Sequence, residues 1–545
     1  MNMGAQFFKE IVDTEGKLLS IEENYPDHFN FAYDVLDVMA KKNPTQRALV
    51  WCNTEGDEKI ISFAELSQWS NQAATVFLDA GIGKGDHVIV ALKRHYEYWI
   101  VAMALHKIGA VMVPVTHMLT TEDWLYRIHA TKVSGIICTP FNQVPIHVAE
   151  AIAEATIECP LWTVQARVDG FRNFSEEMMS APPLSQRIEN LATDAMVLYF
   201  TSGTTGQPKG VIHDFTYPLA HYVTAKYWQQ VQEGGLHFTV AETGWAKASW
   251  GKMYGQWLAG SAVMVYDFDN FEPKQLANII NHYQVTSFCA PPTIYRYLTR
   301  KGTPDIPSVR TVVTAGEYLS PEVFERFEAR TGLSLQAGYG QTETALLIAN
   351  YKGMKNLEGS LGQPSAMYDI ALHDDAGRPV AQGDIGEVVI IPREKDRHPL
   401  GVFAGYLDNQ ALYDHVWRGG VFHTGDAAWQ DAEGYYWFHG RFDDIIKSGG
   451  YRIGPSEIEH VLEKHPAVLE CCVIGVPDAL RGQAIKAFIV LNQGYEESPA
   501  LEKHIKEACN SQLAEYKWLR QIAFVEALPK TISGKIRTST LKNQQ

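Results

Sequence analysis

Short apolar runs alternate with amphipathic segments between residues 28 and 332, and this alternation restricts the fold more than any other feature. Apolar runs with the length of buried strands occupy residues 48–52, 59–63, 87–92, 111–115, 135–138, 260–266, 287–290 and 312–315. Segments with helical periodicity occupy residues 28–45, 62–80, 96–108, 121–131, 273–283 and 321–330. Strands that alternate with helices at this spacing form parallel β-α units. The sequence therefore predicts an α/β protein with mostly parallel sheets.

The pattern changes in the last third of the chain. After about residue 365 the apolar runs become shorter and turns separate them. Beyond the charged junction at residues 441–444, a helix from Pro455, strands at 470–476 and 484–491, and a helix from Ala500 are expected. Because 545 residues exceed one ordinary core, we expect a large multi-lobed N-terminal domain at 1–441. A small α+β domain is expected at 442–545.

Composition excludes several functional classes. The chain is 46% hydrophobic and 20% charged, which is typical of globular proteins, and its net charge of −16 provides no basic field for nucleic acid. Its seven cysteines are an odd number and contain no C-x-x-C pair. This usage predicts reduced, buried thiols, without a disulfide framework or a zinc site.

Neither a signal peptide nor a membrane span is predicted. Residues 1–10 contain no apolar segment of the kind that signal peptides carry. The longest apolar run, residues 99–115, is interrupted by His106 and Lys107 and is too short to cross a bilayer. We therefore expect a cytoplasmic protein, and we predict no particular oligomeric state.

Residues 199–211 form a loop suited to phosphate. Three glycines, four hydroxyls and Lys209 lie between two apolar runs, at Thr201-Ser202-Gly203-Thr204-Thr205-Gly206-Gln207-Pro208-Lys209-Gly210. Glycines allow backbone N–H groups to surround an anion, and lysine adds a positive charge. A Walker A loop needs a helix after its lysine, whereas Gly210 and a β-branched run follow here. A polar surface turn remains the alternative.

Four further short motifs follow this glycine loop along the chain. They are Gly338-Tyr339-Gly340-Gln341-Thr342-Glu343, Thr424-Gly425-Asp426, Gly440-Arg441-Phe442-Asp443-Asp444 and Pro529-Lys530-Thr531-Ile532-Ser533-Gly534-Lys535. Each alone is more typical of a structural turn or a solvated tail than of a catalytic site. What distinguishes these motifs is that they occur together, in this order and at this spacing.

Taken with the glycine loop, the four motifs resemble the adenylate-forming superfamily of acyl-CoA synthetases, peptide-synthetase adenylation domains and luciferases. The resemblance extends from about residue 30 to residue 540, and strings at 242–245, 290–296 and 451–457 are similar to short- and medium-chain acyl-CoA synthetases. It implies that a small-molecule carboxylic acid and ATP give acyl-AMP and pyrophosphate, and that the CoA thiol then gives acyl-CoA and AMP. The implied cofactors are ATP, Mg²⁺ and coenzyme A.

The resemblance also implies roles for individual residues. The glycine loop would hold the β- and γ-phosphates, Thr342 would contact phosphate, and Glu343 with Thr201 would bind Mg²⁺. Asp426 would bind the ribose hydroxyls beside Arg441, and Tyr339 would stack on adenine. The residues implied to bind ATP are Thr201, Ser202, Gly203, Thr204, Thr205, Gly206, Lys209, Gly316, Glu317, Gly338, Tyr339, Gly340, Gln341, Thr342, Asp426, Arg441, Arg452 and Lys535.

Catalysis is implied to involve a moving lysine. Lys535 resembles the family's adenylation lysine, which bridges the attacking carboxylate and the α-phosphate, with Lys209, Thr342 and Glu343 in support. Asp443 matches the hinge position, so the small domain would be mobile and would remove Lys535 before CoA attacks. The CoA surface would comprise Gly449, Gly450, Tyr451 and Arg481, with Lys517 or Arg520 as further phosphate contacts. Leu519 and Thr538 depart from the family pattern, which has proline and a second arginine there.

The acyl pocket is expected to admit more than acetate. Acetate-restricted relatives have tryptophan where this chain has Gly340, so room for several carbons is implied, each worth about 0.8 kcal/mol when buried. Trp245 and Trp257 would limit the length of the pocket, although at least two of Trp245, Trp250, Tyr254 and Trp257 are expected in the core. We predict a short to medium-chain or branched acid. An aromatic-acid CoA ligase, a stand-alone ligase that loads an acyl carrier protein, a luciferase-like monooxygenase and an inactive nucleotide-binding protein are the alternatives.

Overall fold

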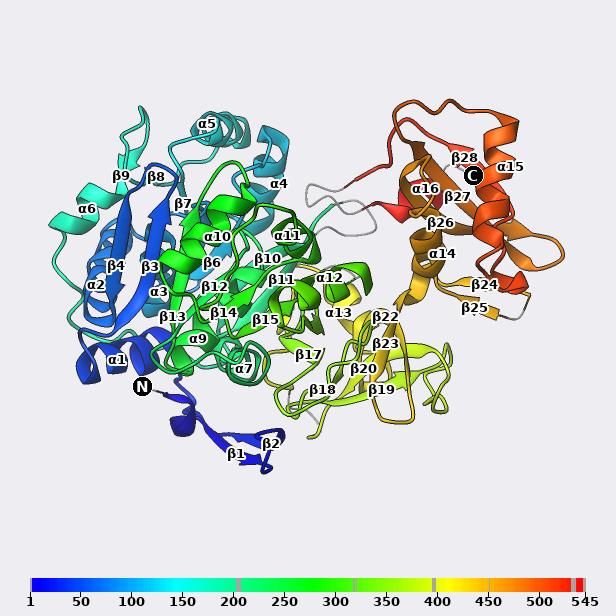
Figure 1. Cartoon of the computed structure of the whole chain (residues 1–545). Helices are drawn as coiled ribbons and strands as arrows, with labels where there is room; N and C mark the ends of the chain where they lie inside the picture. The colour runs from blue at the N-terminus through cyan, green and yellow to red at the C-terminus, as the bar shows by residue number, and fades with distance from the viewer. Residues whose placement is uncertain are drawn as a thin grey trace. The chain divides into compact units, whose positions relative to one another are not determined.

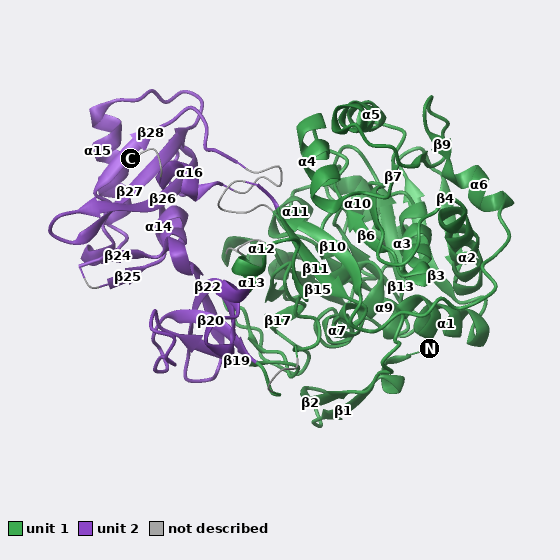
Figure 2. Cartoon of the chain, turned by 180° about the vertical axis from the view of Figure 1, so that it is seen from behind, with its two compact units in different colours: residues 1–201, 209–369, 392–413 green, residues 202–208, 370–391, 414–545 purple. Residues whose placement is uncertain are grey.

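The computed structural model describes residues 2–201, 207–316, 319, 321–394, 398–449, 451–530 and 536–542. They belong to two compact units (Figures 1 and 2). Unit 1 comprises residues 1–201, 209–369 and 392–413, and unit 2 comprises residues 202–208, 370–391 and 414–545. Two large sheets belong to unit 1, and two smaller ones belong to unit 2.

The first sheet of unit 1 has eight strands in the order β21-β11-β10-β6-β5-β7-β8-β9 (Figure 1). Its strands are β5 (His87–Ala91), β6 (Val111–Pro114), β7 (Gly135–Cys138), β8 (Leu161–Thr163), β9 (Arg172–Asn173), β10 (Ala195–Thr201), β11 (Lys209–Asp214) and β21 (Gly405–Tyr406). The strands from β10 to β9 are parallel, whereas β11 runs antiparallel to both β10 and β21. The helices that connect or flank these strands are α2 (Phe63–Asp79), α3 (Glu97–Ile108), α4 (Thr121–Thr131), α5 (Val144–Ala155) and α6 (Phe174–Ser180).

The second sheet of unit 1 has nine strands in the order β18-β17-β16-β15-β14-β12-β13-β3-β4. Its strands are β3 (Arg47–Asn53), β4 (Glu58–Ser62), β12 (Leu236–Thr239), β13 (Ala262–Asp267), β14 (Ser287–Cys289), β15 (Thr311–Thr314), β16 (Gln336–Gly340), β17 (Leu346–Ala349) and β18 (Gln363–Pro364). The central six strands, from β3 to β16, are parallel. The accompanying helices are η2 (Ala32–Leu36), α1 (Asp37–Lys42), α7 (Tyr217–Val223), η3 (Thr224–Trp228), α8 (Lys247–Gly251), α9 (Tyr254–Leu258), α10 (Pro273–His282), α11 (Pro292–Leu298) and α12 (Pro321–Thr331).

Helices α2 and α3 show why the apolar run near residue 100 is not a membrane segment. Ser62 begins α2 with a capping box to Glu65, and Gly109 ends α3 in the left-handed conformation. Every residue of α3 is buried, including Lys107, whose ammonium group bonds Asp37 at 2.8 Å. The run is therefore an internal helix. No helix of the described chain is long and apolar enough to cross a membrane, and the cytoplasmic location remains a prediction.

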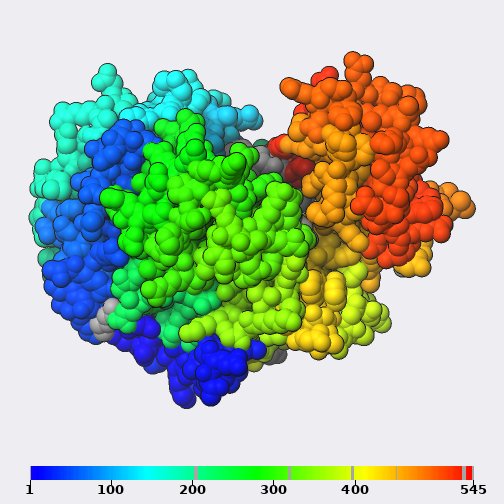
Figure 3. Space-filling model, viewed as in Figure 1, coloured from blue at the N-terminus to red at the C-terminus, as the bar shows by residue number. Residues whose placement is uncertain are grey.

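A hairpin at the N-terminus was not expected from the sequence. Strands β1 (Phe8–Val12) and β2 (Leu18–Glu23) pair antiparallel, and they lie on the surface of unit 1, where Figure 3 shows them in dark blue. Phe8 and Leu18 are buried, whereas Ile11, Val12 and Leu19 are about half exposed. The apolar alternation of such a short ribbon is too brief to separate it from a loop.

Unit 2 contains two smaller sheets. The four-stranded sheet has the order β19-β20-β22-β23, and its strands are β19 (Asp369–His373), β20 (Gly386–Ile391), β22 (Phe422–Gln430) and β23 (Tyr436–Arg441). The five-stranded sheet contains β24 (Ile446–Ser448), β25 (Tyr451–Ile453), β26 (Val468–Asp478), β27 (Gly482–Leu491) and β28 (Gln521–Phe524). Its helices are α14 (Pro455–Leu462), α15 (Pro499–Asn510) and α16 (Thr538–Lys542).

The two faces of the five-stranded sheet have separate cores. Cys471 packs with residues of α14 and α15, whereas the adjacent Cys472 packs with Leu528 and Leu541 of α16. Neighbouring strand residues point to opposite faces, as the sequence predicts for this pair. All seven cysteines are free, and all but Cys159 are buried. The predicted fold class is confirmed: a large α/β part with mostly parallel sheets precedes a small α+β part.

Candidate active site

The glycine loop connects β10 and β11, near one edge of the eight-stranded sheet. Thr201 is the last residue of β10 and pairs with Lys209, the first residue of β11. No helix follows Lys209, so the predicted distinction from a Walker A loop is confirmed. Ser202, Gly203, Thr204, Thr205 and Gly206 lie outside the described residues. The two predicted ligands at the ends of the loop are therefore neighbours across one antiparallel pair.

Lys209, Tyr406 and Glu343 form a chain of contacts beside this loop. The ammonium nitrogen of Lys209 lies 5.5 Å from the ring centroid of Tyr406, and the Tyr406 hydroxyl donates to Glu343 Oε1 at 2.9 Å. Tyr406 reaches this place because β21 pairs with β11 at Val211. The backbone N–H of Phe403 donates to the Glu343 carbonyl at 2.8 Å. A strand pair thus brings a lysine and a carboxylate from distant motifs to one tyrosine.

Thr342 is fixed through its backbone by a buried histidine. His213 Nε2 lies 2.7 Å from the carbonyl oxygen of Thr342, and because a carbonyl only accepts, Nε2 is the protonated nitrogen. Burial lowers the pKa of His213 to about 4, so the ring is neutral at neutral pH. The ring also stacks on Tyr217 at 3.8 Å. In the turn itself, the Gln341 N–H donates to the Thr344 hydroxyl at 3.0 Å.

The residues expected around adenine lie at the ends of β15 and β16. Gly316 follows β15 with φ of 97°, a conformation that favours glycine, and Glu317 lies outside the described residues. Tyr339 is half-buried on β16 and pairs with Ile348. Lys247 of α8 donates to the carbonyl of Ala315. The sequence analysis did not single out this lysine, which stands beside Gly316.

Two indole rings cover the glycines of β16. An added Cβ at Gly338 would lie 2.6 Å from Trp228 Cζ2, and one at Gly340 would lie 2.5 Å from Trp250 Cη2. The Cβ at Gly340 would also lie 2.5 Å from the carbonyl oxygen of Ala345. The indole of Trp250 thus occupies the volume directly beside Gly340, and the room for several carbons expected there stays a prediction.

The two tryptophans expected in the acyl pocket have different surroundings. Trp257 is fully buried, packs edge-on against Phe63, and donates through Nε1 to the Ala48 carbonyl at 2.9 Å. These contacts make Trp257 part of the core, and its expected place in the pocket is corrected. Trp245 is only half-buried in the turn before α8, and its place in a pocket stays a prediction.

Asp426 lies in unit 2, in a buried ionic group. Arg441 pairs with it across β22 and β23 and bonds its Oδ1 at 2.9 Å. Behind them, Glu387 accepts from His423 Nδ1 at 2.8 Å, from Arg418 at 2.9 Å and from the Gly425 N–H at 2.9 Å. Asp426 and Glu387 are 6% and 3% exposed, so neither carboxylate is freely solvated. The turn at residues 424–426 is thus stabilised by a second carboxylate, that of Glu387.

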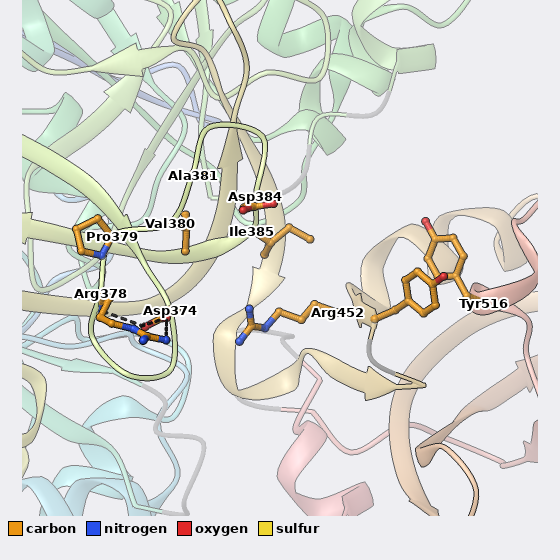
Figure 4. Close-up of a pocket in the computed structure, with 10 residues that line it drawn as sticks. Asp374, Arg378, Pro379, Val380, Ala381, Asp384, Ile385, Arg452 and Tyr516 are labelled. Atoms are coloured by element: carbon orange, nitrogen blue, oxygen red, sulfur yellow. Dashed lines mark hydrogen bonds and ion pairs between the residues drawn. The ribbon is translucent and has the colours of Figure 1, made fainter.

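The residues expected to contact CoA lie on and beside the five-stranded sheet. Tyr451 stacks on Tyr516 with 4.3 Å between the ring centroids, and Arg452 forms an ion pair with Asp375. Together with the hairpin at 374–385, these aromatic and basic groups line a cavity of about 720 Å³, into which Arg452 extends (Figure 4). The Gly449 N–H donates to the Arg481 carbonyl at 2.9 Å, and Gly450 lies outside the described residues.

Two further residues, Lys517 and Leu519, belong to the segment expected to contact CoA. Lys517 forms an ion pair with Glu457 at 2.5 Å, which leaves it less suited to phosphate than an unpaired lysine would be. Leu519, where relatives have proline, is 1% exposed and belongs to the core of α14 and α15. The departure at Leu519 therefore affects packing.

Lys535 lies outside the described residues, whereas the expected hinge residue Asp443 lies in the short helix η5 (Phe442–Asp444). Among the described residues no three His, Cys, Asp or Glu side chains cluster to bind a metal. Mg²⁺ commonly takes one or two carboxylates and completes its shell with phosphate and water. The single carboxylate of Glu343 beside Lys209 fits a metal that is held jointly with nucleotide phosphates.

Besides Lys247, the sequence motifs did not indicate three supporting residues: His213, Tyr406 and Glu387. His213 lies on β11, the strand after the glycine loop, Tyr406 lies on β21, which pairs with β11, and Glu387 lies on β20, which pairs with the strand of Asp426. Tyr406 lies inside the apolar run at residues 400–407, where no local motif distinguishes it. All three needed strand register, which a single sequence does not provide.

Family profiles match most of the chain. Residues 36–407 match the AMP-binding enzyme family, and residues 457–535 match the AMP-binding enzyme C-terminal domain. Among curated proteins, the chain is 36% identical over 536 residues to acyl-coenzyme A synthetase ACSM3, mitochondrial, of Homo sapiens, covering 95% of this chain and 90% of that protein. It is 37% identical over 540 residues to ACSM4, mitochondrial, of Mus musculus, covering 96% and 92%.

Solved structures of ligases have the same fold. The anthranilate CoA ligase AuaEII in complex with anthranoyl-AMP aligns with a TM-score of 0.81 and 27% identity, over 95% of this chain and 98% of that chain. A Brucella canis acyl-CoA synthetase aligns with a TM-score of 0.70 and 28% identity, over 96% and 95%. With both family profiles matched in order, the chain belongs to the adenylate-forming AMP-binding enzymes, among the AMP-forming acyl-CoA ligases.

Proposed function

We propose that this ligase couples a short to medium-chain or branched carboxylic acid to CoA through an acyl-AMP intermediate, and that the glycine loop holds the leaving pyrophosphate. The Lys209–Tyr406–Glu343 contact chain is the observation that supports this assignment most strongly. It places a cation and a carboxylate at the end of the loop where two anions, a carboxylate and a triphosphate, must meet. Neutralising that charge is the main catalytic task in such a reaction.

Individual residues have separate tasks in the first step. Lys209 and Thr342 contact the phosphates, and the loop residues from Thr201 to Gly206 donate to them. Magnesium bound by Glu343 and Thr201 would neutralise phosphate charge. Lys535 bridges the attacking carboxylate and the α-phosphate, so the negative charge that moves between them stays balanced.

Separate residues are proposed to bind the ribose and the adenine of the nucleoside. Asp426 accepts from the ribose hydroxyls, and Arg441 orients this carboxylate through a charge-assisted hydrogen bond. Tyr339 stacks on adenine beside Gly316 and Glu317. Because Asp426 is buried and Arg441 holds one of its oxygens, its carboxylate has little rotational freedom.

The second step requires a different set of residues. We propose that residues 442–545 rotate about Asp443 relative to residues 1–441, so that Lys535 leaves after adenylation and the CoA surface takes its place. Gly449, Gly450 and Tyr451 would line the pantetheine arm, and Arg481 would meet its phosphates. Arg452 would approach phosphate or the acyl carboxylate. Magnesium, the hinge and these contacts are parts of the proposal.

The length of the acid is proposed to depend on Trp250 more than on Gly340. Trp250→Ala should open the volume beside Gly340 and favour longer acids by about fourfold for each added CH₂, at about 0.8 kcal/mol each. Competition assays with four- to ten-carbon acids measure this shift. Trp257→Phe is the matched control, since it should lower stability without changing chain-length preference. An unchanged preference in Trp250→Ala would remove Trp250 from the pocket.

An aromatic acid is the second candidate substrate. Trp228 and Trp250 provide aromatic surfaces, and AuaEII, which shares the fold at 27% identity, is an anthranilate CoA ligase. ATP–pyrophosphate exchange with aliphatic and aromatic acids, followed by AMP release on addition of CoA, separates these alternatives. Exchange that is strongest with acetate would contradict the chain-length proposal. Exchange without CoA-dependent AMP release would favour loading of a carrier protein, and absence of exchange would contradict the proposed function.

A further inference from the structure

The C-terminal helix α16 is bonded to the residues at the expected hinge. Lys542 Nζ donates to Asp444 Oδ1 at 2.7 Å and to the carbonyl oxygen of Asp443 at 3.1 Å. At the other end of the helix, the Thr538 hydroxyl lies 3.3 Å from Asp444 Oδ2 and 3.4 Å from Oδ1. The Asp444 side chain is 18% exposed, so these contacts are shielded from most solvent.

The same helix follows directly after the segment that contains Lys535. Residues 531–535 join Lys530 to Ile536, and these two end residues form an antiparallel bridge. The Arg537 N–H donates to the Pro529 carbonyl at 2.7 Å, and Lys530 forms an ion pair with Glu470 of β26 at 2.5 Å. Both ends of the Lys535 segment therefore have defined attachments, and the C-terminal attachment continues into α16.

The contact between Lys542 and Asp444, called the anchor from here on, can persist when the hinge rotates. The carbonyl of Asp443 and the N–H of Asp444 belong to one planar peptide group. Rotation about φ or ψ of Asp443 moves that group, and with it the Asp444 side chain, as the C-terminal side of the hinge. Both acceptors of Lys542 therefore lie on the moving side.

We propose that Lys542 and Asp444 are positioning residues for Lys535, an inference that rests on the proposed roles of Lys535 and of the hinge at Asp443. The Lys542–Asp444 contact fixes α16, which begins shortly after Lys535 in the chain, to the first peptide beyond the hinge. The proposed effect is that Lys535 reaches the same point at each return to the adenylation orientation. The departure at Thr538 fits this arrangement, because its hydroxyl reaches the carboxylate to which Lys542 is also bonded.

Loss of the anchor should impair one half-reaction selectively. Without Lys542, α16 loses its charged contact with Asp444 and its bond to the Asp443 carbonyl, whereas the longer Thr538 contact, the buried Leu541 and the bridge at Ile536 remain. A misplacement of about 1 Å can cost about 100-fold in rate, so we expect Lys542→Met and Asp444→Asn to lower ATP–pyrophosphate exchange about 10- to 100-fold. Thioester formation from supplied butyryl-AMP and CoA does not use Lys535 and should stay within about twofold, as expected when only the first-step geometry changes.

Conservative and matched variants separate positioning from folding. Lys542→Arg keeps a donor and should retain exchange, and the double variant Asp444→Lys with Lys542→Asp should recover part of the loss of either single reversal. Lys503→Met removes an exposed lysine from a 3.7 Å pair on α15 and should change neither half-reaction. A similar loss of both half-reactions in Lys542→Met, or no loss in exchange, would overturn the positioning role.

Lys535→Ala tests the premise independently. If this variant loses exchange but keeps thioester formation, the proposed role of Lys535 holds. The Lys542→Met result then tests only whether Lys542 and Asp444 position Lys535. If Lys535→Ala keeps full exchange, the proposed function is wrong in its catalytic residue, and the positioning proposal is overturned with it.

Discussion

Two carboxylates expected to contact the nucleotide have opposite surroundings. Glu343 stands in the turn after β16, is half-buried, and accepts from the single hydroxyl of Tyr406 at 2.9 Å. Asp426 is 6% exposed, is bonded by Arg441, and is supported through Gly425 by the buried Glu387. One carboxylate is lightly held in unit 1, and the other belongs to an ionic network in unit 2.

The difference matches the tasks proposed for the two groups. A carboxylate that shares a metal with phosphate oxygens must keep accessible lone pairs and adjust as the phosphates move. A carboxylate that selects ribose needs a fixed direction, which buried, charge-assisted hydrogen bonds supply. The comparison therefore predicts that changes at Glu343 affect activity alone, whereas changes behind Asp426 affect stability as well.

The largest effect is expected at Glu343. Glu343→Gln keeps the size of the side chain and an acceptor for Tyr406 but removes the charge proposed to hold Mg²⁺. Exchange activity should fall by about 10³-fold, because such electrostatic groups contribute about 3–4 kcal/mol to transition states. The melting temperature should stay within about 2 °C of the parent, since a half-exposed polar change rarely alters stability by more than about 0.5 kcal/mol.

The Mg²⁺ dependence of exchange provides the direct measurement for Glu343→Gln. The variant should need a higher Mg²⁺ concentration for half-maximal rate. Asp408→Asn, a change at another acidic residue of unit 1, serves as a control. A parent-like rate in Glu343→Gln would show that this carboxylate is not part of the site. The proposed difference in task between Glu343 and Asp426 would then be wrong.

The next largest effect is expected at Glu387. Glu387→Gln leaves the side chains of Arg418 and His423 beside an uncharged partner and should lower the free energy of unfolding by about 3 kcal/mol, the scale for breaking a buried ion pair. Urea unfolding measures this change, with the exposed Glu433→Gln as control. Because Asp426 loses its support, the KM for ATP should also rise. An unchanged unfolding free energy would show that the network is not needed for stability.

Acid should remove the stability that this network provides. Burial raises the pKa of Glu387, but the His423 hydrogen bond, the charges of His423 and Arg418, and the Gly425 N–H lower the pKa overall. A carboxylate with a depressed folded pKa stabilises the fold above its unfolded pKa of about 4.3, and that contribution is lost as pH falls through the folded pKa. The stability difference between parent and Glu387→Gln should therefore shrink from pH 7 toward about pH 3. A stability difference that does not change with pH would contradict the lowered pKa of Glu387.

The sequence predicted the elements of the fold better than the contacts between them. Strands such as β5, β7 and β13 and helices such as α2 and α3 have strong local signals, including the capping box at Ser62 and the glycine at 109. The order of the strands in each sheet depends on long-range pairing that local patterns do not contain. The pairing of β21 with β11, which places Tyr406 beside Lys209, is an example.

The acyl side shows a different limit of sequence reasoning. Gly340 alone predicts space, because a missing side chain leaves volume unless a neighbour fills it. Trp250 fills that volume from a helix ninety residues earlier in the chain. Conversely, Trp257 has the aromatic character of a pocket residue but bonds Ala48 in the core. Residue type was visible in the sequence, whereas orientation was decided by tertiary packing.

The smallest effect is expected at Tyr406, whose hydroxyl donates to Glu343 Oε1 and whose ring lies beside Lys209. Tyr406→Phe removes the 2.9 Å hydrogen bond to Glu343 but retains the ring beneath Lys209. A hydrogen bond to a charged group contributes about 1.5–3 kcal/mol at most, and a half-exposed one contributes less, so exchange should fall by about five- to tenfold. The loss should appear mainly in kcat if the hydroxyl orients Glu343 during the reaction.

Tyr413→Phe is the matched control, because the Tyr413 hydroxyl bonds the exposed His398 at 2.8 Å. It should leave exchange unchanged. In a double-mutant cycle, Tyr406→Phe should cause little further loss once Glu343→Gln is present, since the hydroxyl then has no charged partner to orient. Fully additive losses would mean that Tyr406 acts independently of Glu343. The Glu343 carboxylate would then be positioned by the backbone of its turn, where the Phe403 N–H donates to the main-chain carbonyl of Glu343.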